Sequence, residues 1–446
     1  QGMLQALDPY SEFLDETDFK ELRIKTEAQF GGIGIHIGMV EEQLKVISPI
    51  EGTPAARAGI RAGDRIAEIE GKSTRGFTTE DAVKLLRGDP GTKVKIKIAR
   101  PGVPELIPFE LTRAIINIKS VPYFGMVARN IGYIRLADMS RVASRDMLQA
   151  MDSLFSSGAK KLIFDLRSNG GGLLEEGKEV TDLFLGPGKL VVRTKGRVPE
   201  TNNDFVTEKE DKYGEYPLVV LVDRGSASAA EIVAGALQDW ERAVILGDTT
   251  FGKGSVQRIY PLGPEIGMKI TTANWYTPSG RCINKSRAKS LVVIKDTTKD
   301  SQQNFWTLGP QHRSLYGGGG IAPDIYLPPE KLTGLAAQIP RSSFFDFAAE
   351  YANNHPGLTM DFRADEQILA QFNEFLRNKK KLEFTGEEFD SSRDALAEMI
   401  EIEIGGKIDG LHGEYQMRLR RDSYVKKAIE LLEVAHTTEE ILKRIR

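Results

Sequence analysis

Residues 219–240 read VVLVDRGSASAAEIVAGALQDW: a short apolar run, a turn of small residues and then a helical pattern. The pattern predicts a buried strand that ends at Asp223 and a helix that begins near Ser228. Short apolar runs and amphipathic segments alternate in the same way around this stretch, as in GYIRL, SRDMLQAMDSLF, KLIFDL, LLEEGKEVTDLF and AVILG. Such alternation predicts an α/β layer structure with a largely parallel sheet.

The composition is that of a soluble globular protein. The chain has 446 residues, of which 40% are apolar and 28% are charged, and this length predicts about two to four domains. The formal net charge of −3 provides no basic field, so nucleic acid is not an expected partner. The single cysteine, Cys282, excludes an internal disulfide framework and a cysteine metal cluster.

The start of the chain indicates a trimmed protein. It reads QGMLQALDPY, with neither an initiator methionine nor a charged-then-apolar leader. No run of the sequence approaches the roughly 20 apolar residues that span a bilayer. We therefore expect any N-terminal signal or anchor to lie outside this chain.

Four regions are expected along the chain. Residues 1–29 form a helical N-terminal segment. Residues 30–101 form a small β-rich module, in which TTEDAVKLLRG is a helix with Thr79 as its cap and KVKIKIAR is a half-buried strand. Residues 102–339 form the α/β core, and residues 340–446 form amphipathic helices such as DEQILAQFNEFLR.

Ser228 is the candidate nucleophile. Its expected place at a helix N-terminus puts free N–H groups and the positive end of the helix dipole beside it, which favours a developing anion. Serine is also a preferred helix cap, so the alternative is that Ser228 only caps the helix. Ser226 is a rival for either role.

Lys253 is the candidate base that such a serine needs. None of the histidines lies between residues 115 and 311; they are His36, His312, His355, His412 and His436. The segment TTFGKGSVQRIYPL instead carries Lys253 between two glycines, with Gln257 four residues on and on the same face of an expected strand. Burial would lower the pKa of Lys253 toward neutrality, whereas the alternative is a solvated surface lysine.

The glycine-rich segment DLRSNGGGLLEEG is a candidate oxyanion hole. Gly170–Gly172 lie between a buried strand and a helix that begins near Leu173. N–H groups exposed by this turn could act together with the N–H of Ala229. Glycine turns of this kind also cradle phosphates or permit tight packing, so the turn alone leaves these alternatives open.

Several separated motifs resemble, in the expected order, the carboxyl-terminal processing proteases, which are PDZ-containing serine peptidases with a Ser-Lys dyad. The motifs are LDPYSEFL, DLRSNGGG, GSASAAEIVAGALQD, FGKGSVQ, TTANWYTPSGRCIN and GGIAPDI. The resemblance covers residues 1 to about 330 and implies an α/β protease core with crotonase-like layers, an inserted PDZ domain and a helical C-terminal region.

The resemblance also assigns roles to residues of this sequence. It implies Ser228 as the nucleophile, Lys253 as the general base and Gln257 as the support of the lysine. It places the oxyanion glycine within Gly170–Gly172, of which Gly171 is favoured. One departure is Ala230, which stands where many relatives have another serine and which is not expected to matter for catalysis.

Residues 30–101 resemble the PDZ domain of this family. The run Gly32-Ile33-Gly34-Ile35 matches the loop whose N–H groups capture a substrate's C-terminal carboxylate, and the peptide would then add as a strand. Arg87 matches a position that in some relatives links PDZ docking to the active site. The alternative is a solvated arginine that closes a helix.

The implied function is that of a serine endopeptidase that recognises C-terminal tails through its PDZ domain and needs no metal or other cofactor. One alternative is an inactive PDZ adaptor on a protease scaffold, and another is an acyl-CoA enzyme of the crotonase type. The expected partners are proteins or peptides with accessible C-termini. Membrane association through an N-terminal anchor outside this chain, and homo-oligomerisation, stay open. Relatives work outside the cytoplasm, so we expect an extracytoplasmic, periplasmic setting.

Overall fold

The computed structural model describes residues 2–285 and 304–445, and the chain folds into two compact units. The first unit comprises Gln1–Ala28, Ile118–Pro329 and Ser423–Arg446, and the second comprises Gln29–Asn117 and Glu330–Asp422. The boundaries of the four regions derived from the sequence stay predictions.

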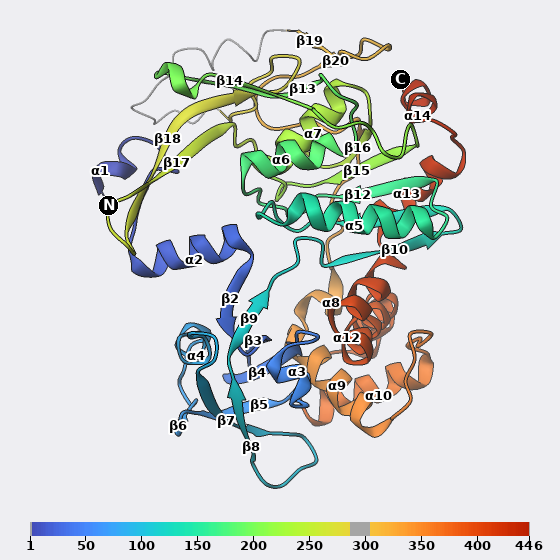
Figure 1. Ribbon diagram of the computed structural model, residues 1–446. Coiled ribbons are helices and arrows are strands. Elements are labelled where there is room, and N and C mark those ends of the chain that lie inside the picture. The colour runs from blue at the N-terminus through green and yellow to red at the C-terminus, as the bar shows by residue number, and fades with distance from the viewer. Residues whose placement is uncertain (1, 286–303, 446) are drawn as a thin grey trace. The chain divides into compact units, whose positions relative to one another are not determined.

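A six-stranded sheet forms the centre of the first unit, with the order β10-β11-β12-β15-β16-β21 (Figure 1). The strands are β10 (Tyr123–Ala128), β11 (Ile131–Arg135), β12 (Lys161–Asp165), β15 (Leu218–Val222), β16 (Val244–Gly247) and β21 (Ile325–Tyr326). Those from β11 to β21 pair in parallel, and β10 joins antiparallel at the edge. Every residue of β12, β15 and β16 is buried, as the continuous apolar runs predict.

Helices cover this sheet (Figure 1). The helices α5 (Ala143–Ser156), α6 (Leu174–Asp182) and α7 (Ala229–Asp239) share one apolar cluster with its strands. The helices α13 (Ser423–Glu433) and α14 (Thr438–Arg444) also pack against it, outside that cluster. Lys161 Nζ donates to the carbonyl of Leu432, and the N–H of Leu218 donates to Thr438 Oγ1, so polar contacts join these last helices to the sheet.

A second sheet lies on the other side of α7. It has the order β1-β18-β13-β14, with β17 paired to β18. The strands are β1 (Glu12–Leu14), β13 (Leu190–Gly196), β14 (Asn203–Val206), β17 (Ser255–Pro261) and β18 (Gly267–Tyr276). Ile232 and Ala236 of α7 pack on Val192 and Trp275 of this sheet, whereas Val233 and Leu237 belong to the central cluster. The helix is therefore enclosed on two sides, and all of its residues are buried.

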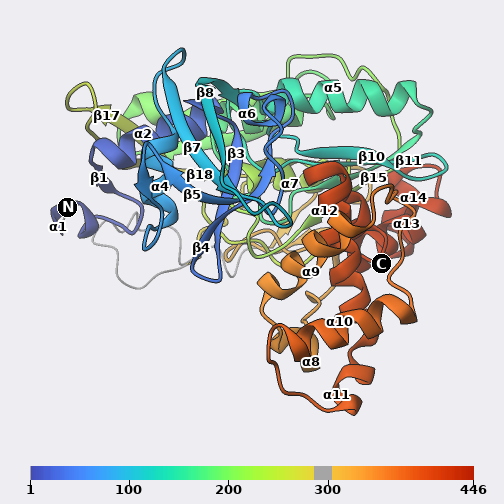
Figure 2. The same ribbon diagram turned by 90° about the horizontal axis from the view of Figure 1, so that it is seen from below.

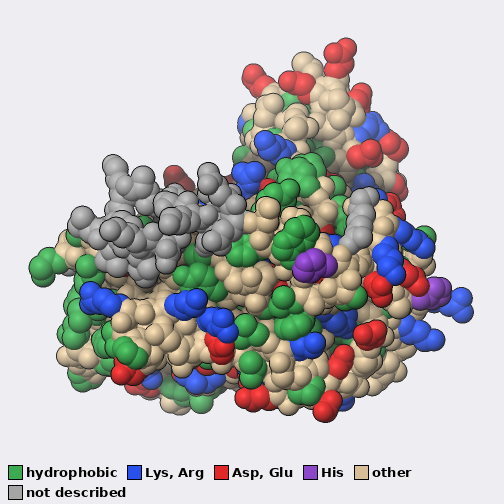
Figure 3. Space-filling model, turned by 90° about the horizontal axis from the view of Figure 1, so that it is seen from above, with side chains coloured by type: hydrophobic (Ala, Val, Ile, Leu, Met, Phe, Trp, Pro, Cys, Tyr) green, Lys and Arg blue, Asp and Glu red, His purple; other side chains and the backbone are tan. Residues whose placement is uncertain are grey.

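Short elements complete the first unit. They are α1 (Gly2–Gln5), α2 (Glu16–Glu27), the 3-10 turn η1 (Pro199–Thr201), β19 (Phe305–Trp306) and β20 (Ser314–Leu315). No described helix in either unit combines the length and apolar character that a bilayer span requires. Both acidic and basic side chains lie on the face drawn in Figure 3.

The second unit contains a curled antiparallel sheet with the order β3-β4-β5-β7-β8 and with β6 paired to β5 (Figure 2). The strands are β3 (Ile35–Val40), β4 (Gln43–Pro49), β5 (Arg65–Ile69), β6 (Lys72–Ser73), β7 (Lys93–Ala99) and β8 (Ile107–Thr112); β2 (Gln29–Gly32) and β9 (Ala114–Asn117) form a separate pair. Val94, Ile96 and Ile98 of β7 alternate inward, which confirms the predicted half-buried strand.

Two helices accompany these strands, α3 (Pro54–Arg57) and α4 (Thr79–Leu86). The predicted cap of α4 is wrong by one residue. Thr78 is the N-cap, and its hydroxyl accepts from the N–H of Asp81, whose carboxylate in turn accepts from the N–H of Thr78. This reciprocal pair is a capping box, which needs the acidic residue three positions after the cap.

The remaining helices of the second unit form an aromatic-rich cluster. They are α8 (Gly334–Gln338), α9 (Arg341–Asn354), α10 (Glu366–Asn378), α11 (Gly386–Ser391) and α12 (Arg393–Leu419). Phe344, Phe347 and Phe372 pack at its centre. A kink divides α12, because Asp409 and Gly410 leave the helical conformation.

Candidate active site

Ser228 lies in a strained turn between β15 and α7. Its backbone has φ 55° and ψ −118°, a left-handed conformation that costs a non-glycine residue about 1–3 kcal/mol and is concentrated at functional sites. Ser226, the rival serine, is fully buried; its Oγ donates to the carbonyl of Leu166 at 2.8 Å and accepts from the N–H of Asp223 at 3.0 Å. Ser226 therefore builds the turn, whereas Ser228 is only partly buried at its apex.

Glu231 joins the two halves of the site, and the sequence patterns did not single it out. Its Oε2 accepts from the backbone N–H of Ser228 at 2.8 Å and from that of Lys253 at 2.9 Å. Its Oε1 accepts from the N–H of Gly252 at 2.7 Å and from Thr250 Oγ1 at 2.5 Å. Burial raises the pKa of this carboxyl, and the four hydrogen bonds oppose that shift. One buried carboxylate thus holds the backbone of both candidate catalytic residues.

Lys253 is a partly buried lysine that makes no salt bridge with any residue the structure describes. Burial is the main cause that lowers its pKa, and the charge of Lys269 lowers it further; Glu12, Glu231 and Asp8 act in the opposite direction. Its Nζ lies 4.9 Å from the centroid of the Tyr10 ring. The N-terminal motif LDPYSEFL therefore belongs to the site, because its tyrosine covers the amine.

Gln257 lies on β17 close to the same motif. Its Nε2 donates to Ser255 Oγ at 2.9 Å and to Thr271 Oγ1 at 3.3 Å, and Thr271 Oγ1 donates to Asp8 at 3.0 Å. The argument that Lys253 and Gln257 share a strand face is wrong. Lys253 precedes β17, and a register shift between Val256 and Gln257 interrupts the alternation.

Gly171 faces the serine turn. A Cβ built on it would lie 2.7 Å from the carbonyl oxygen of Ala227, 2.8 Å from Ser228 Cβ and 2.9 Å from the nitrogen of Ala229. A Cβ built on Gly170 would meet nothing within 4 Å, and one built on Gly172 would meet Met139. Gly171 is therefore the glycine in contact with the serine turn. Its φ of 88° also requires glycine.

The two proposed oxyanion donors differ in their present partners. The N–H of Gly171 donates to Asn169 Oδ1 at 2.9 Å. The N–H of Ala229 opens α7 and has no acceptor among the described residues. Asn169 is itself fully buried, and its Nδ2 donates to the carbonyl of Leu136 at 3.0 Å.

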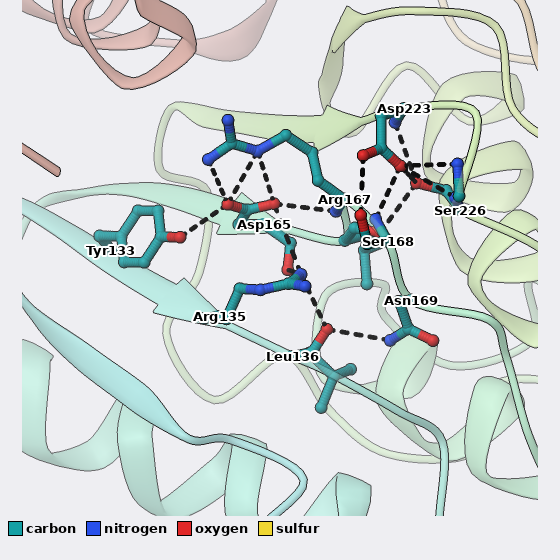
Figure 4. Close-up of polar contacts among 11 residues, drawn as sticks. Tyr133, Arg135, Leu136, Asp165, Arg167, Ser168, Asn169, Asp223 and Ser226 are labelled. Atoms are coloured by element: carbon teal, nitrogen blue, oxygen red, sulfur yellow. Dashed lines mark hydrogen bonds and ion pairs between the residues drawn. The ribbon is translucent and has the colours of Figure 1, made fainter. Parts of the chain in front are cut away.

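A buried ionic cluster supports the base of the glycine turn (Figure 4). Asp165, at the end of β12, pairs with Arg167 at 2.6 Å and accepts from the hydroxyl of Tyr133 at 2.6 Å. Arg135 lies 3.7 Å from the same carboxylate. Burial alone would raise the pKa of Asp165, but the two arginines and these hydrogen bonds hold it below its usual value. Among the described residues, no group of three His, Cys, Asp or Glu side chains could hold a metal ion.

The candidate capture loop lies in the second unit. Gly32 ends β2, Ile33 is buried, Gly34 has φ 77°, and Ile35 begins β3. β3 is an edge strand of its sheet among the described residues.

Arg87 follows α4 in the same unit. Its guanidinium lies over the Phe30 ring at 4.8 Å, so the arginine packs on an aromatic side chain rather than extending freely.

Comparisons with known proteins place this arrangement in a family. Residues 130–294 match peptidase family S41, and residues 45–100 match the PDZ domain. The carboxy-terminal-processing protease of Bartonella bacilliformis is 40% identical over 345 residues, which are 76% of this chain and 77% of that protein. The carboxy-terminal processing protease CtpA of Bacillus subtilis is 38% identical over 66% of this chain and 62% of its own length. Among solved structures, the photosystem II D1 C-terminal processing protease is 29% identical and has a TM-score of 0.39. The match covers 73% of this chain and 80% of the chain of that protease.

The fold, with one segment that matches a peptidase family and another that matches a PDZ domain, is that of a PDZ-containing α/β serine peptidase. The chain belongs to the carboxy-terminal processing proteases of peptidase family S41, and it is a serine-type endopeptidase.

Proposed function

We propose that the chain cleaves peptide bonds with a Ser228–Lys253 dyad. The observation that carries this proposal is the shared carboxylate of Glu231, which binds the N–H groups of both residues at 2.8 and 2.9 Å. Two further features support it: the strained backbone of Ser228 and the lowered pKa of Lys253. A lysine acts as a base only in its neutral form, so burial beside Lys269 prepares it for this role.

The mechanism follows from these groups. Neutral Lys253 takes the proton of Ser228 Oγ while the oxygen attacks the peptide carbonyl carbon, and the N–H groups of Ala229 and Gly171 stabilise the oxyanion. The C–N bond then breaks, and Lys253 gives its proton to the departing amine. Lys253 then takes a proton from the water that attacks the resulting ester, and it gives this proton to Ser228 Oγ as the acyl C–O bond breaks. For full use of Gly171, the substrate oxygen must replace or share the acceptor that Asn169 Oδ1 now provides.

Substrate capture is assigned to residues 30–101. The N–H groups of Gly32 to Ile35 bind the terminal carboxylate, and the tail adds as a strand to the edge of β3. A PDZ domain within a protease family supports peptides with free C-termini as the substrates. An extracytoplasmic, periplasmic setting is an expectation from the family resemblance.

Arg87 is proposed to couple tail capture to the rate of cleavage, in keeping with its packing on Phe30 beside the capture loop. In that role Arg87→Ala abolishes stimulation of cleavage by a C-terminal peptide, whereas Lys84→Ala, on the helix that Arg87 follows, does not. Unchanged stimulation in Arg87→Ala would remove this role and leave the dyad unaffected.

The test of the dyad is cleavage of unfolded casein by the full chain, Ser228→Ala and Lys253→Ala, each checked for folding by circular dichroism. Activity lost in both variants supports the proposal. Activity that survives in Lys253→Ala means another base. An inactive parent chain that still binds C-terminal peptides, and that added peptide does not activate, favours the adaptor function instead.

A further inference from the structure

The turn that carries Gly171 and the turn that carries Ser228 are joined by the carboxylate of Asp223 (Figure 4). Its Oδ1 accepts from the backbone N–H of Ser168 at 2.7 Å, and its Oδ2 accepts from Ser168 Oγ at 3.0 Å. The same Oδ1 accepts from the N–H groups of Gly225 at 2.9 Å and Ser226 at 3.1 Å. One side chain therefore shapes its own turn and fastens the neighbouring one.

The two turns also touch directly. The N–H of Ala227 donates to the carbonyl of Asn169 at 2.9 Å. A Cβ on Gly225 would lie 2.8 Å from Ser168 Cα, so the backbones are in close approach. Ser168 itself is held at φ 54°, a left-handed conformation that needs support from its surroundings. The hydrogen bonds from Ser168 to the Asp223 carboxylate provide that support, and bonds to an ionised acceptor are stronger than neutral ones.

The separation of these turns matters because each carries one of the proposed oxyanion donors. Gly171 follows Ser168 by three residues, and Ala229 follows Ser226 by three. Both N–H groups must reach one developing oxyanion at hydrogen-bond distance, so a small shift of one turn against the other weakens the pair.

We propose that Asp223 is a positioning residue for catalysis, which sets the separation of the Gly171 and Ala229 N–H groups by holding Ser168. The proposal rests on the proposed function, because it takes Ser228 as the nucleophile. Asp223 acts through Ser168 and Ser226 and not on the reacting atoms.

The experiment compares Asp223→Ala, Asp223→Asn and Asp248→Ala in the full chain. Asp248 is the matched control. Its carboxylate accepts from Arg224 of the serine turn at 2.7 Å and, among the described residues, makes no hydrogen bond to the glycine turn. The readouts are kcat and KM for a fluorogenic peptide with a free C-terminus, inhibition by the corresponding peptide aldehyde, and affinity for the product peptide. Active sites are titrated with a fluorophosphonate.

In Asp223→Ala we expect kcat per active site to fall about tenfold to hundredfold, which is no more than the loss expected when one oxyanion donor is removed. Inhibition by the aldehyde, whose adduct carries the oxyanion, should weaken by a similar factor. KM and product affinity should stay within about twofold. Asp223→Asn keeps one of the two acceptor oxygens, so its kcat should fall only about threefold to tenfold. Asp248→Ala should keep its kcat.

Full kcat per active site in Asp223→Ala would overturn the inference, while an inactive Ser228→Ala would still uphold the proposed function. If Asp223→Ala does not fold, Asp223→Asn decides: equal losses in kcat, aldehyde inhibition and product affinity would mean a structural role only. Retained activity in Ser228→Ala would instead remove the proposed function itself.

Discussion

Ser228 and Lys253 donate their backbone N–H groups to the same oxygen atom, Oε2 of Glu231, at 2.8 and 2.9 Å. The two residues are 25 positions apart in sequence and come from separate turns, so a third side chain determines how these turns meet. The carboxylate is fully buried and also binds Gly252 and Thr250. Its loss would leave several buried donors without an acceptor, which costs about 1–3 kcal/mol for each group.

Glu231→Gln should therefore lower kcat by about 10²-fold, because the new amide NH₂ would face N–H donors and push the two turns apart. Glu241→Gln is the matched control: Glu241 is also buried and bonded to Thr307 and Gln311, but it lies past the other end of α7. Peptide cleavage and thermal unfolding of both variants check this. Equal loss of kcat in the two would mean that destabilisation alone is responsible.

The ion pair between Glu12 and Lys269 predicts two opposite shifts in the pH profile. Lys269 lowers the pKa of Lys253 and Glu12 raises it. The base is active when neutral, so a higher pKa moves the acidic limb of kcat/KM to higher pH. Lys269→Met should move that limb up, and Glu12→Gln should move it down.

The pair provides its own control, since both substitutions break one ion pair and should have similar effects on stability. Profiles of kcat/KM from about pH 5 to pH 10 measure the acidic limb in each of the two variants. Shifts in the same direction, or a limb that neither variant moves, would show that Lys253 is not the titrating base.

Gly171→Ala should lower kcat for peptide cleavage by at least about 10²-fold. The added methyl would lie within 3 Å of Ala227, Ser228 and Ala229, and the φ of 88° would be strained as well. Gly158→Ala separates these causes, because Gly158 has φ 95° but open space around its Cβ position. The control should lose stability, by about 1 kcal/mol, and keep its kcat.

Gly34→Ala should weaken capture of C-terminal peptides. A methyl there would lie 2.3 Å from Thr53 Cβ at φ 77°, so the loop must move, whereas Gly52→Ala has a similar φ of 71° and meets nothing within 4 Å. We expect a loss of affinity of at least about tenfold, near 1.4 kcal/mol, for Gly34→Ala only. Fluorescence anisotropy with a free-acid peptide measures it. Equal affinity for the amidated peptide would contradict carboxylate capture.

The alternation of strands and helices, the buried runs of the parallel sheet and the half-buried β7 were all predictable from periodicity. Ser228 was predictable as a helix N-terminus because the small-residue turn separates an apolar run from a helical pattern. The left-handed φ of Ser228 was not, because it belongs to a turn with tertiary contacts that a sequence pattern does not contain: Gly171 approaches it closely, and Ser226 is hydrogen-bonded to Leu166.

Other parts of the site depend on contacts that sequence spacing does not contain. Spacing in the sequence does not single out Glu231, because its partners at Gly252 and Lys253 come from a later turn. Tyr10 lies 243 positions before Lys253, so periodicity could not bring them together. The predicted alternation of side chains from Lys253 to Gln257 is interrupted by a register shift between Val256 and Gln257. A two-residue periodicity in the sequence does not reveal such a shift.

The enclosed position of α7 has a consequence for how this protease can diversify. Both sides of the helix are filled, and a Cβ on Gly235 would lie 3.0 Å from Ile321 and 3.1 Å from Thr277. Enlarging substitutions in this helix would be selected against, whatever the substrate. The candidate capture loop and the β3 edge belong to the second unit and are not part of the apolar clusters that enclose α7. Under the proposed function, evolution can therefore exchange the proteins that are chosen for cleavage while the reaction itself stays the same.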